Sequence, residues 1–470
     1  MPEYKWNVLG ITTIGVFMVS LDSSILNIAI PSISKDLKSS FQIVQWIPII
    51  YLLMMAITLI SFGRLADLKG RKKFFLMGII LFTFSSFLSM LATSGEMLIF
   101  FRAIQGIGSS FIAANAASMI TEAFPHEETG KALGINVATI YLGLVIGPVL
   151  GGLLLEFFTW RSIFAINLPI GIILTIIGIK KLQKSTSHMK NESFDFLGAL
   201  IFGITLASFL LGLTLANDLG WFSIYIIMIF LSSIISFIIF IIIEKNHESP
   251  MLNISFFRRN RVFAAANLAA LVNYMATSGV IFLLSIYIQI ILKISPAITA
   301  LLLLPTSLTM ALCSPLSGRI SDKIGTRILC TLGMIIMAIG FFSLVLIIMY
   351  LPIIYILFSQ FIIGIGIGFF SSPNQSAIMK SVEKKDVGIA AGTLSTMRVV
   401  GQSISVALLS AILASFISYS VLNPILSNDI KSISLAIKIQ FELGMHFAFI
   451  FSACICIFGA IISLIRGKEI

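Results

Sequence analysis

The sequence predicts an all-α integral membrane protein. Its 470 residues are 58% hydrophobic and only 11% charged, and their mean hydropathy is +1.06. Soluble domains do not have this composition. Fourteen separate apolar runs are each long enough to cross a hydrocarbon layer of about 30 Å as a helix, which takes roughly 20 residues. Because unpaired backbone amides are too costly in lipid, each run is expected to be helical.

These apolar runs define the expected spans in chain order. Charged stretches at 180–195 and 244–261 separate spans six and seven and spans eight and nine. Spans one to fourteen are expected at residues 7–30, 44–62, 74–92, 97–120, 132–155, 163–179, 197–216, 222–243, 262–292, 297–316, 328–349, 352–370, 387–421 and 443–465.

The basic residues indicate the orientation of the spans, because Lys and Arg accumulate in short loops on the cytoplasmic side. With the N-terminus in the cytoplasm, six of the 31 Lys and Arg lie outside and two lie within spans, so the remaining 23 are cytoplasmic. We therefore expect a multi-pass protein of the cell membrane with both termini in the cytoplasm. The six outer residues are Lys35, Lys38, Arg161, Lys293, Lys431 and Lys438.

Several classes of function are disfavoured by the same composition. The net charge of +11 is scattered over loops separated by spans, whereas nucleic-acid binding needs the charge on one folded face with aromatic residues among it. The four cysteines lie in or beside apolar runs, and no Cys or His spacing suits a metal. No cleavable signal is expected, because few residues precede span one. Without a catalytic constellation or a soluble domain, an enzyme is the least favoured function.

An internal repeat indicates two related halves. The segment GRLADLKGR at 63–71 joins spans two and three, and it recurs as GRISDKIGTR at 318–327 between spans ten and eleven. The shift is eight spans, whereas a directly repeated half of six spans would give a shift of six. We therefore predict a six-helix bundle over residues 1–181, two inserted spans with their linkers over 182–260, and a second six-helix bundle over 261–470.

Five motifs together resemble those of the major facilitator superfamily. The segment at 63–71 is similar to the superfamily's loop between its second and third helices. RAIQGIGSS at 102–110 resembles its Arg and Gln-Gly motif, and GLVIGPVLGG at 143–152 resembles the motif of its antiporters. LDSSILNIAIP at 21–31 and WRSIFAINLPIG at 160–171 are similar to the fourteen-span drug:proton antiporter branch. The resemblance covers the whole chain and implies a multidrug efflux transporter with the major facilitator fold, in which two inserted helices separate two six-helix bundles.

The repeated loop is expected to act as a conformational switch. Its glycines permit tight turns, and its cations hold it in the cytoplasm. The acid at position 67 contributes little to topology, and its recurrence at position 322 suggests a cationic side chain or a helix N-terminus as its partner in one conformation only. A solvated turn acid is the alternative. The expected switch residues are Gly63, Arg64, Asp67, Gly70, Arg71 and Asp322.

Span five carries glycines at intervals of four residues. Gly143, Gly147 and Gly151 share one smooth helix face that lets another backbone approach closely, and Pro148 invites a bend. The resemblance implies that this antiporter helix, which also includes Gly152, packs against its counterpart in the other half, here span thirteen. Such an interface would seal and open as the halves rock. Ordinary helix packing without gating is the alternative.

Three ionisable residues lie within spans, where a charge costs at least about 2.5 kcal/mol and is functional by default. From the helical rise, Asp22 of span one and Arg102 of span four lie at comparable depths of about 13 and 9 Å, and Arg398 of span thirteen lies about 17 Å deep. Desolvation favours a neutral carboxyl group and a neighbouring guanidinium favours the charged one. Access of water can therefore decide whether Asp22 holds a proton. We predict that Asp22 and Arg102 couple transport to protons; a permanent structural ion pair is the alternative.

The sequence thus predicts a secondary active transporter that exports amphipathic small molecules or drugs in exchange for protons, by alternating access. We expect no cofactor besides the proton gradient, no metal, and a monomer whose partners are the substrate, protons and the bilayer. A proton-coupled uptake symporter for an anionic solute drawn to Arg102 and Arg398, and a non-transporting membrane receptor on the same scaffold, are the alternatives. The residues expected to line the substrate cavity are Asn27, Gln105, Asn115, Asn136, Tyr141, Asn273, Tyr274, Gln289 and Arg398.

Overall fold

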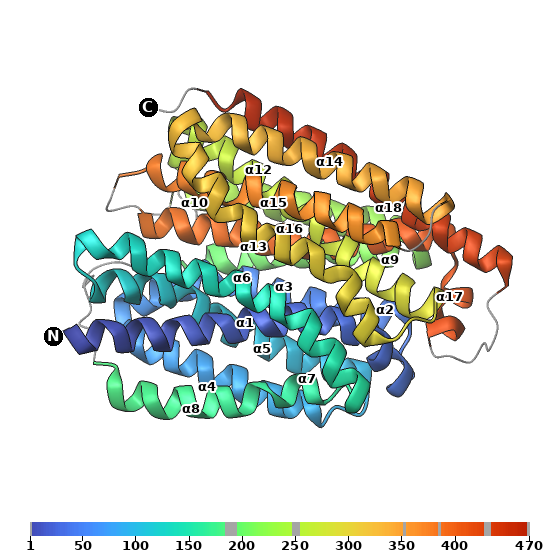
Figure 1. Ribbon diagram of the computed structural model, residues 1–470, viewed down its shortest axis with the longest axis horizontal. Coiled ribbons are helices and arrows are strands. Elements are labelled where there is room, and N and C mark those ends of the chain that lie inside the picture. Colours follow the sequence, from blue (N-terminus) through green and yellow to red (C-terminus); the bar gives the residue numbers. More distant parts are fainter. Residues whose placement is uncertain are drawn as a thin grey trace.

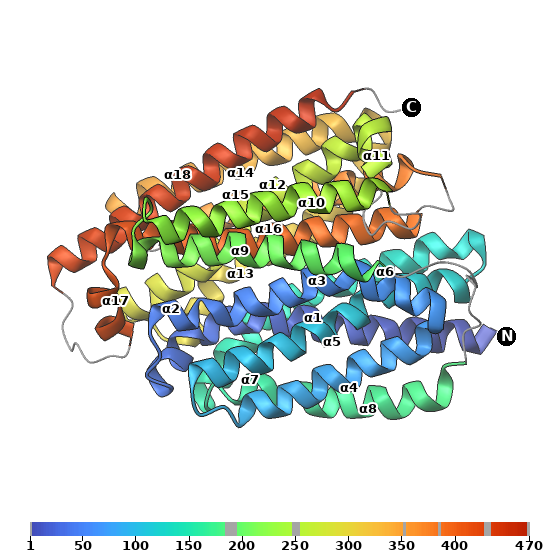
Figure 2. The same ribbon diagram turned by 180° about the vertical axis from the view of Figure 1, so that it is seen from behind.

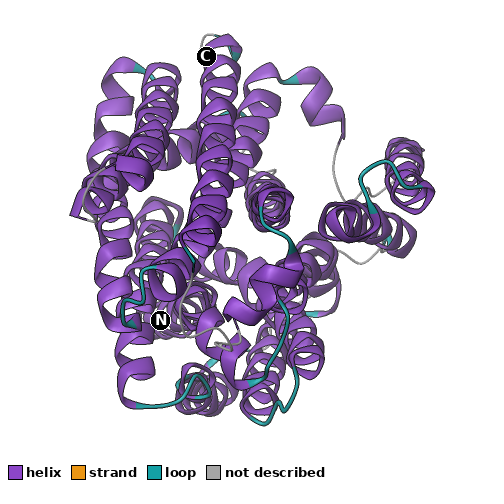
Figure 3. Cartoon of the chain, turned by 90° about the vertical axis from the view of Figure 1, so that its right-hand side faces the viewer, coloured by secondary structure: helices purple, strands orange, loops and turns teal. Residues whose placement is uncertain are grey.

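The chain folds into long helices that run roughly parallel to one another (Figure 1). The structure is a computed structural model that describes residues 2–183, 195–246, 254–350, 354–383, 387–426 and 434–467. Within these ranges fourteen helices are long and apolar enough to cross a membrane, which confirms the predicted number of spans. Seen nearly end-on, the described chain consists of helices and the loops that join them (Figure 3).

The spanning helices match the apolar runs of the sequence and extend beyond most of them. They are α1 (Pro2–Asp36), α3 (Trp46–Lys69), α4 (Arg71–Met90), α5 (Gly95–Ala123), α6 (His126–Phe157), α8 (Asn167–Lys181), α9 (Phe196–Leu219), α10 (Ile224–Asn246), α12 (Arg261–Ile286), α13 (Pro296–Ile324), α14 (Thr326–Tyr350), α15 (Ile354–Lys380), α16 (Val387–Phe416) and α18 (Leu435–Ile465).

Five short helices were not predicted. The run expected as one span over 262–292 is α12 followed by a π-helical turn, η1 (Tyr287–Ile291), and the run over 387–421 is divided between α16 and α17 (Tyr419–Leu426). Hydropathy is insensitive to these breaks, because both sides of each break are apolar. The remaining short helices are α2 (Phe41–Val44), α7 (Ser162–Ala165) and α11 (Ile254–Arg259).

The contacts divide the helices into two bundles and a pair. Helices α1, α3, α4, α5, α6 and α8 pack on one another, as do α12, α13, α14, α15, α16 and α18. The first bundle forms the lower layer of Figure 1 and the second forms the upper layer. Helices α9 and α10 pack against each other, and α9 also contacts α3 and α16, one helix of each bundle. The fold is therefore two six-helix bundles with two additional helices.

The two ends of the molecule differ in composition. Helix α1 begins and α18 ends at the left of Figure 1, at the end that also holds the α3–α4 and α13–α14 turns. We name it the basic end, because exposed Lys69, Lys73, Arg319 and Lys323 lie in or beside these turns. The short helices α2 and α17 lie at the opposite end (Figures 1 and 2).

Contacts between the bundles gather toward the opposite end. The Ser285 hydroxyl donates to the Asn27 carbonyl oxygen at 2.7 Å, and the Gln289 side-chain amide donates to the Ile28 carbonyl oxygen at 3.0 Å. The backbone N–H of Phe41 donates to the Asn423 side chain at 2.8 Å, which joins α2 to α17. In Figure 1, α14 and α18 rise away from α1 toward the basic end. Direct bonding thus holds the bundles together at the opposite end.

The partner of span five was predicted wrongly. Helix α6 packs against α1 of its own bundle and against α13, span ten, of the other bundle, whereas span thirteen (α16) packs against α3. The expected pairing assumed that span five meets its counterpart by position in the other half. The observed interface instead pairs α6 with α13 and α3 with α16, so each helix crosses to a non-equivalent helix.

Candidate functional site

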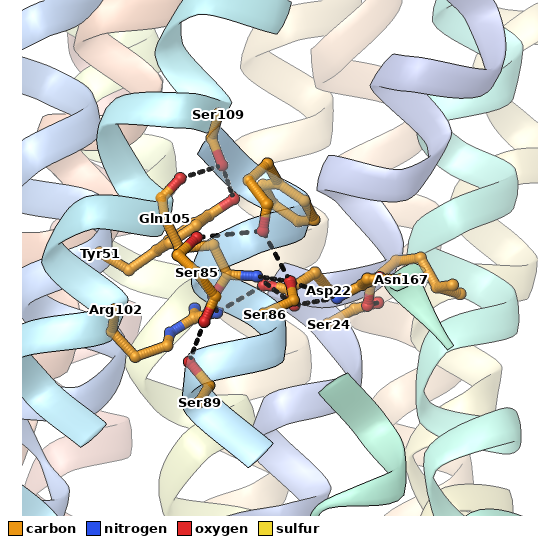
Figure 4. A network of polar contacts seen from close by, with 12 residues as sticks. Asp22, Ser24, Tyr51, Ser85, Ser86, Ser89, Arg102, Gln105, Ser109 and Asn167 are labelled. Carbon is orange, nitrogen blue, oxygen red and sulfur yellow. Dashed lines mark hydrogen bonds and ion pairs between the residues drawn. The ribbon is translucent and has the colours of Figure 1, made fainter. Parts of the chain in front are cut away.

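A buried ion pair lies in the middle of the first bundle. Arg102 Nη1 of α5 donates to Asp22 Oδ2 of α1 at 2.5 Å (Figure 4). Each side chain is only 1% exposed. The helical rise predicted comparable depths for these two residues, and the direct contact confirms that they are neighbours. Pairing with the carboxylate offsets much of the cost of burying a guanidinium this deeply.

Two amides complete the hydrogen bonding of the carboxylate. Gln105 Nε2 donates to Asp22 Oδ1 at 2.9 Å, and Asn167 Nδ2 donates to the same oxygen at 2.8 Å. Both amides also donate to the hydroxyl of Ser86, at 2.8 and 3.3 Å. Gln105 lies one helical turn after Arg102, so that its Oε1 accepts from Arg102 Nη1 at 2.6 Å. The carboxylate therefore joins α1 to α5 and α8, and the Ser86 hydroxyl ties α4 to the same two amides.

Aromatic rings enclose the guanidinium. The carbon of the Arg102 guanidinium lies 4.1 Å from the ring centre of Tyr51 and 5.9 Å from that of Phe164. The Ser109 hydroxyl donates to the Tyr51 hydroxyl at 2.7 Å, which fixes that ring (Figure 4). Such rings attract a cation through their negative faces and exclude water from it. The site is thus dry, charge-balanced and built on rigid helices.

The chemistry open to this arrangement is protonation of Asp22. The ionised carboxylate accepts hydrogen bonds from Arg102, Gln105 and Asn167. A proton on either oxygen would replace an acceptor by a donor facing other donors and would remove the charge that balances Arg102. Protonation would therefore weaken the links from α1 to α5 and α8.

The structure shows which residues the sequence analysis missed. Ser86, Tyr51 and Asn167 were not among the predicted site residues, although Asn167 belongs to the quoted motif at 160–171. Asn167 is the first residue of α8, directly after the short helix α7, and this break turns its side chain toward Asp22. A run of serines in α4 is a weak signal, because most of its hydroxyls bond their own helix, as those of Ser85 and Ser89 do.

The glycine face of α6 points into its own bundle. A Cβ atom on Gly143 would lie 2.8 Å from the Ser20 Cβ of α1, and a Cβ atom on Gly147 would lie 1.8 Å from the Ser24 Oγ of the same helix. Gly151 faces Ile25 of the same helix. The expectation that this face meets the other half is therefore wrong. The four-residue spacing places these three glycines on one face of α6. This face lets α1 approach closely enough for the Ser24 hydroxyl to donate to the Gly143 carbonyl oxygen at 3.1 Å.

Gly152 alone of these glycines faces the other bundle. Its Cβ position lies 2.8 Å from the Ala300 Cβ and 2.9 Å from the Pro296 carbonyl oxygen of α13. It follows Gly151 by one residue and is thus turned by about 100° around the helix. The motif therefore serves two interfaces, one within a bundle and one between bundles.

The predicted cavity residues do not form one group. Tyr141, Tyr274 and Arg398 line a common pocket between the bundles, whereas Gln105 lies in the ion-pair network. Asn27 and Gln289 belong to the contact between α1 and η1 at the opposite end, where the Gln289 amide lies on the backbone next to Asn27. The remaining three are buried within single bundles: Asn115 donates to its own helix, Asn273 donates to the sulfurs of Met334 and Met337, and Asn136 lies in α6.

The repeated loop forms tight turns at its second glycines. Gly70 and Gly325 have φ values of 103° and 88°, which L side chains rarely adopt. Arg71 Nη1 donates to the Ser118 carbonyl oxygen at 3.2 Å and to Glu122 Oε2 at 3.3 Å, so the loop is tied to α5. Gly63 faces Ala114 of the same helix. The side chains of the predicted switch residues Arg64, Asp67 and Asp322 lie outside the described part of the structure.

Comparison with known proteins identifies the family. The family model described as the Major Facilitator Superfamily matches residues 12–196, 196–406 and 266–469. The chain belongs to the Major Facilitator Superfamily. It is a transporter that resembles the multidrug efflux members of this superfamily, and it is not an enzyme.

Individual relatives cover most of the chain. It is 34% identical over 418 residues to the riboflavin transporter RibZ of Clostridioides difficile, covering 89% of this chain and 90% of the relative. It is 29% identical to multidrug resistance protein Stp of Mycobacterium tuberculosis, covering 87% and 75%, and 30% identical to multidrug resistance protein 3 of Bacillus subtilis, covering 87% and 79%.

Solved structures show the same fold. An inward-facing, unoccupied bacterial homologue of the human lysosomal transporter Spinster superposes with a TM-score of 0.72 at 15% identity, covering 98% of this chain and 97% of that one. A D-xylose–proton symporter gives a TM-score of 0.67 at 14% identity, covering 99% and 98%. At this level of identity the likeness is one of fold.

Proposed function

We propose that this transporter exports amphipathic small molecules in exchange for protons. The observation that carries the proposal is the buried Asp22–Arg102 pair, whose carboxylate links α1 to α5 and α8 and is the group that a proton would change. The two relatives named as multidrug resistance proteins support the choice of amphipathic substrates. The protein would act in the cell membrane with the basic end and both termini in the cytoplasm.

Transport would proceed by alternating access between the two bundles, at residues 1–181 and 261–470. The bonds from Ser285 and Gln289 to α1 join the bundles at the opposite end, which we take as its closed state. With the basic end in the cytoplasm, substrate would enter from the inside, and these bonds would break before it could leave to the outside. Protonation of Asp22 would alter the packing of α1, which carries the Ser285 and Gln289 contacts. One proton moving down about 150 mV supplies near 3.5 kcal/mol, enough for roughly a 300-fold substrate gradient.

The proposal is tested by flux in proteoliposomes. Purified protein in vesicles with an acidic lumen is given a neutral, an anionic and a cationic amphipathic dye on the outside. Exchange with protons predicts that at least one dye accumulates in the lumen and leaves when a protonophore collapses the gradient. Accumulation only when the outside is acidic would show symport, and flux independent of the pH gradient would refute proton coupling.

Uptake of a planar polar solute is the second candidate, and the relative named as a riboflavin transporter favours it. An anion drawn to the site would have to use Arg398, because Arg102 is already neutralised by Asp22. The same vesicles decide between the candidates. Riboflavin accumulation that follows an acidic outside, with no dye accumulating in an acidic lumen, would favour uptake.

The proposed orientation makes a prediction of its own. Single cysteines at Lys72 and Lys468 should react with a membrane-impermeant maleimide only after the cytoplasmic side is exposed, whereas a cysteine at Lys431 should react in intact cells. The reason is that cations are retained on the cytoplasmic side. Labelling of position 72 in intact cells would show that the orientation, and with it the direction of transport, is the reverse of the one proposed.

A further inference from the structure

The guanidinium of Arg398 lies between the bundles, and unlike that of Arg102 it has no acid beside it among the described residues. Arg398 Nε is buried and donates to no described acceptor. The Tyr274 side chain is hydrogen-bonded to Arg398 and Tyr141 lies in the same pocket, and among the described residues the guanidinium forms no ion pair. A cation in a low-dielectric interior without a counter-charge is costly. A ligand that supplies the negative charge would remove this cost.

The pocket around Arg398 is formed by both bundles. Tyr141 comes from α6 of the first bundle, and Tyr274 and Arg398 come from α12 and α16 of the second. Counted from the helix starts at the basic end, Tyr141, Tyr274 and Arg398 lie about 22, 20 and 17 Å deep at 1.5 Å per residue. This is the middle of a membrane of ordinary thickness. Transporters bind their substrates at this depth, between the moving parts.

The pocket is narrow in this state and would have to widen to admit a ligand, but its lining indicates the chemistry of that ligand. The guanidinium carbon of Arg398 lies 5.4 Å from the ring centre of Tyr274, and Phe370 adds a further aromatic wall. Asn374 donates to the Ala266 carbonyl oxygen at 3.0 Å, while its Oδ1 is buried without a partner. Flat aromatic walls suit a planar ring system, the guanidinium suits a carboxylate or phenolate, and the free amide oxygen suits a donor.

We propose that this pocket binds the anionic group of a planar aromatic substrate, with Arg398 as its charge partner and Tyr274 and Phe370 as its walls. The proposal rests on the proposed transport function and names the substrate class of that function. It distinguishes the two intramembrane arginines by role. Arg102 balances the proton-carrying acid, whereas Arg398 balances the substrate.

Equilibrium binding tests the proposal without relying on transport. Protein in phosphatidylcholine nanodiscs is dialysed against 2-naphthoate and against 2-naphthamide, two probes of the same ring and nearly the same size that differ in charge. The charged probe should bind about tenfold to a hundredfold more tightly, as expected for a hydrogen-bonded charge in a dry site. The Arg398→Gln variant should lose this preference, and Arg398→Lys should keep part of it. Arg261→Gln, a change of an exposed arginine on α12, serves as the matched control and should bind as the wild type does.

Several outcomes would overturn the proposal. Equal binding of the two probes, no binding of 2-naphthoate at about 10 mM, or a preference that survives Arg398→Gln would overturn it. If Arg398→Gln does not fold, Arg398→Lys must weaken 2-naphthoate binding several-fold while leaving 2-naphthamide unchanged, because lysine lacks the planar fork of the guanidinium. Loss of the preference when phosphatidylglycerol is added would assign the site to an anionic lipid headgroup. Binding with the expected preference but no flux in proteoliposomes would instead refute the proposed transport function alone.

Discussion

Replacing Asp22 by asparagine is expected to abolish accumulation of substrate against a gradient. Asparagine has nearly the shape of the protonated acid but never carries the charge, so the variant would stay in the protonated form. In vesicles with an acidic lumen, the accumulation ratio of a transported dye should fall from as much as roughly 300-fold toward one. Facilitated equilibration down the dye's own gradient should persist, because the pocket between the bundles is untouched.

This experiment needs two further variants. Asp22→Asn leaves Arg102 buried without its counter-charge, which costs about 3–5 kcal/mol and can lower the yield of folded protein. The double change Asp22→Asn with Arg102→Gln removes both charges together and should restore folding but not coupling. Glu156→Gln neutralises an exposed acid on α6 and should leave accumulation unchanged. Full proton-dependent accumulation by the double variant would mean that Asp22 and Arg102 form only a structural ion pair.

The sequence predicts the class of fold well, because a segment that crosses hydrocarbon has to be an apolar helix of about 20 residues. The charge on Lys and Arg and the length of the apolar runs are enough to find fourteen spans. The ion pair is also predictable, since Asp22 and Arg102 are the only opposite charges within spans of the first bundle and the helical rise gives their depths. Asn167 and Ser86 are not, because their contribution depends on the break between α7 and α8 and on the rotation of α4.

Interfaces between helices are less predictable than the helices themselves. In an apolar chain every face is hydrophobic, so composition does not show which face meets which helix. The spacing of Gly143, Gly147 and Gly151 correctly indicates a close approach of another helix, but it does not name α1 as that helix. Only Gly152, one residue farther on, meets the second bundle. Substitutions at the two kinds of glycine in this motif are therefore expected to have different effects.

Replacing Gly147 by leucine is expected to destabilise the first bundle. The new Cβ would lie 1.8 Å from the Ser24 Oγ and 3.1 Å from the Leu21 carbonyl oxygen, so α1 and α6 must separate. Overpacking of this kind costs typically about 1–3 kcal/mol or more. Detergent-purified protein should unfold at a temperature several degrees lower. Gly134→Leu on the same helix, where nothing lies within 4 Å of the new Cβ, is the control and should unfold as the wild type does.

Replacing Gly152 by leucine is expected to disfavour the closed state of the opposite end and to affect the stability of the first bundle less, because its neighbours Ala300 and Pro296 belong to the other bundle. A side chain there obstructs only the state in which α6 and α13 meet, so the bundles are pushed apart at the opposite end while each keeps its own packing. An obstruction of about 1–3 kcal/mol reduces the population of the closed state roughly fivefold to more than a hundredfold.

A cysteine at Ser285, which bonds to α1 in this closed state, should then react much faster with an impermeant maleimide applied from the side of the opposite end. The unfolding temperature should change less than in Gly147→Leu. Unchanged labelling together with full transport would show that the contact between α6 and α13 is ordinary packing and takes no part in gating.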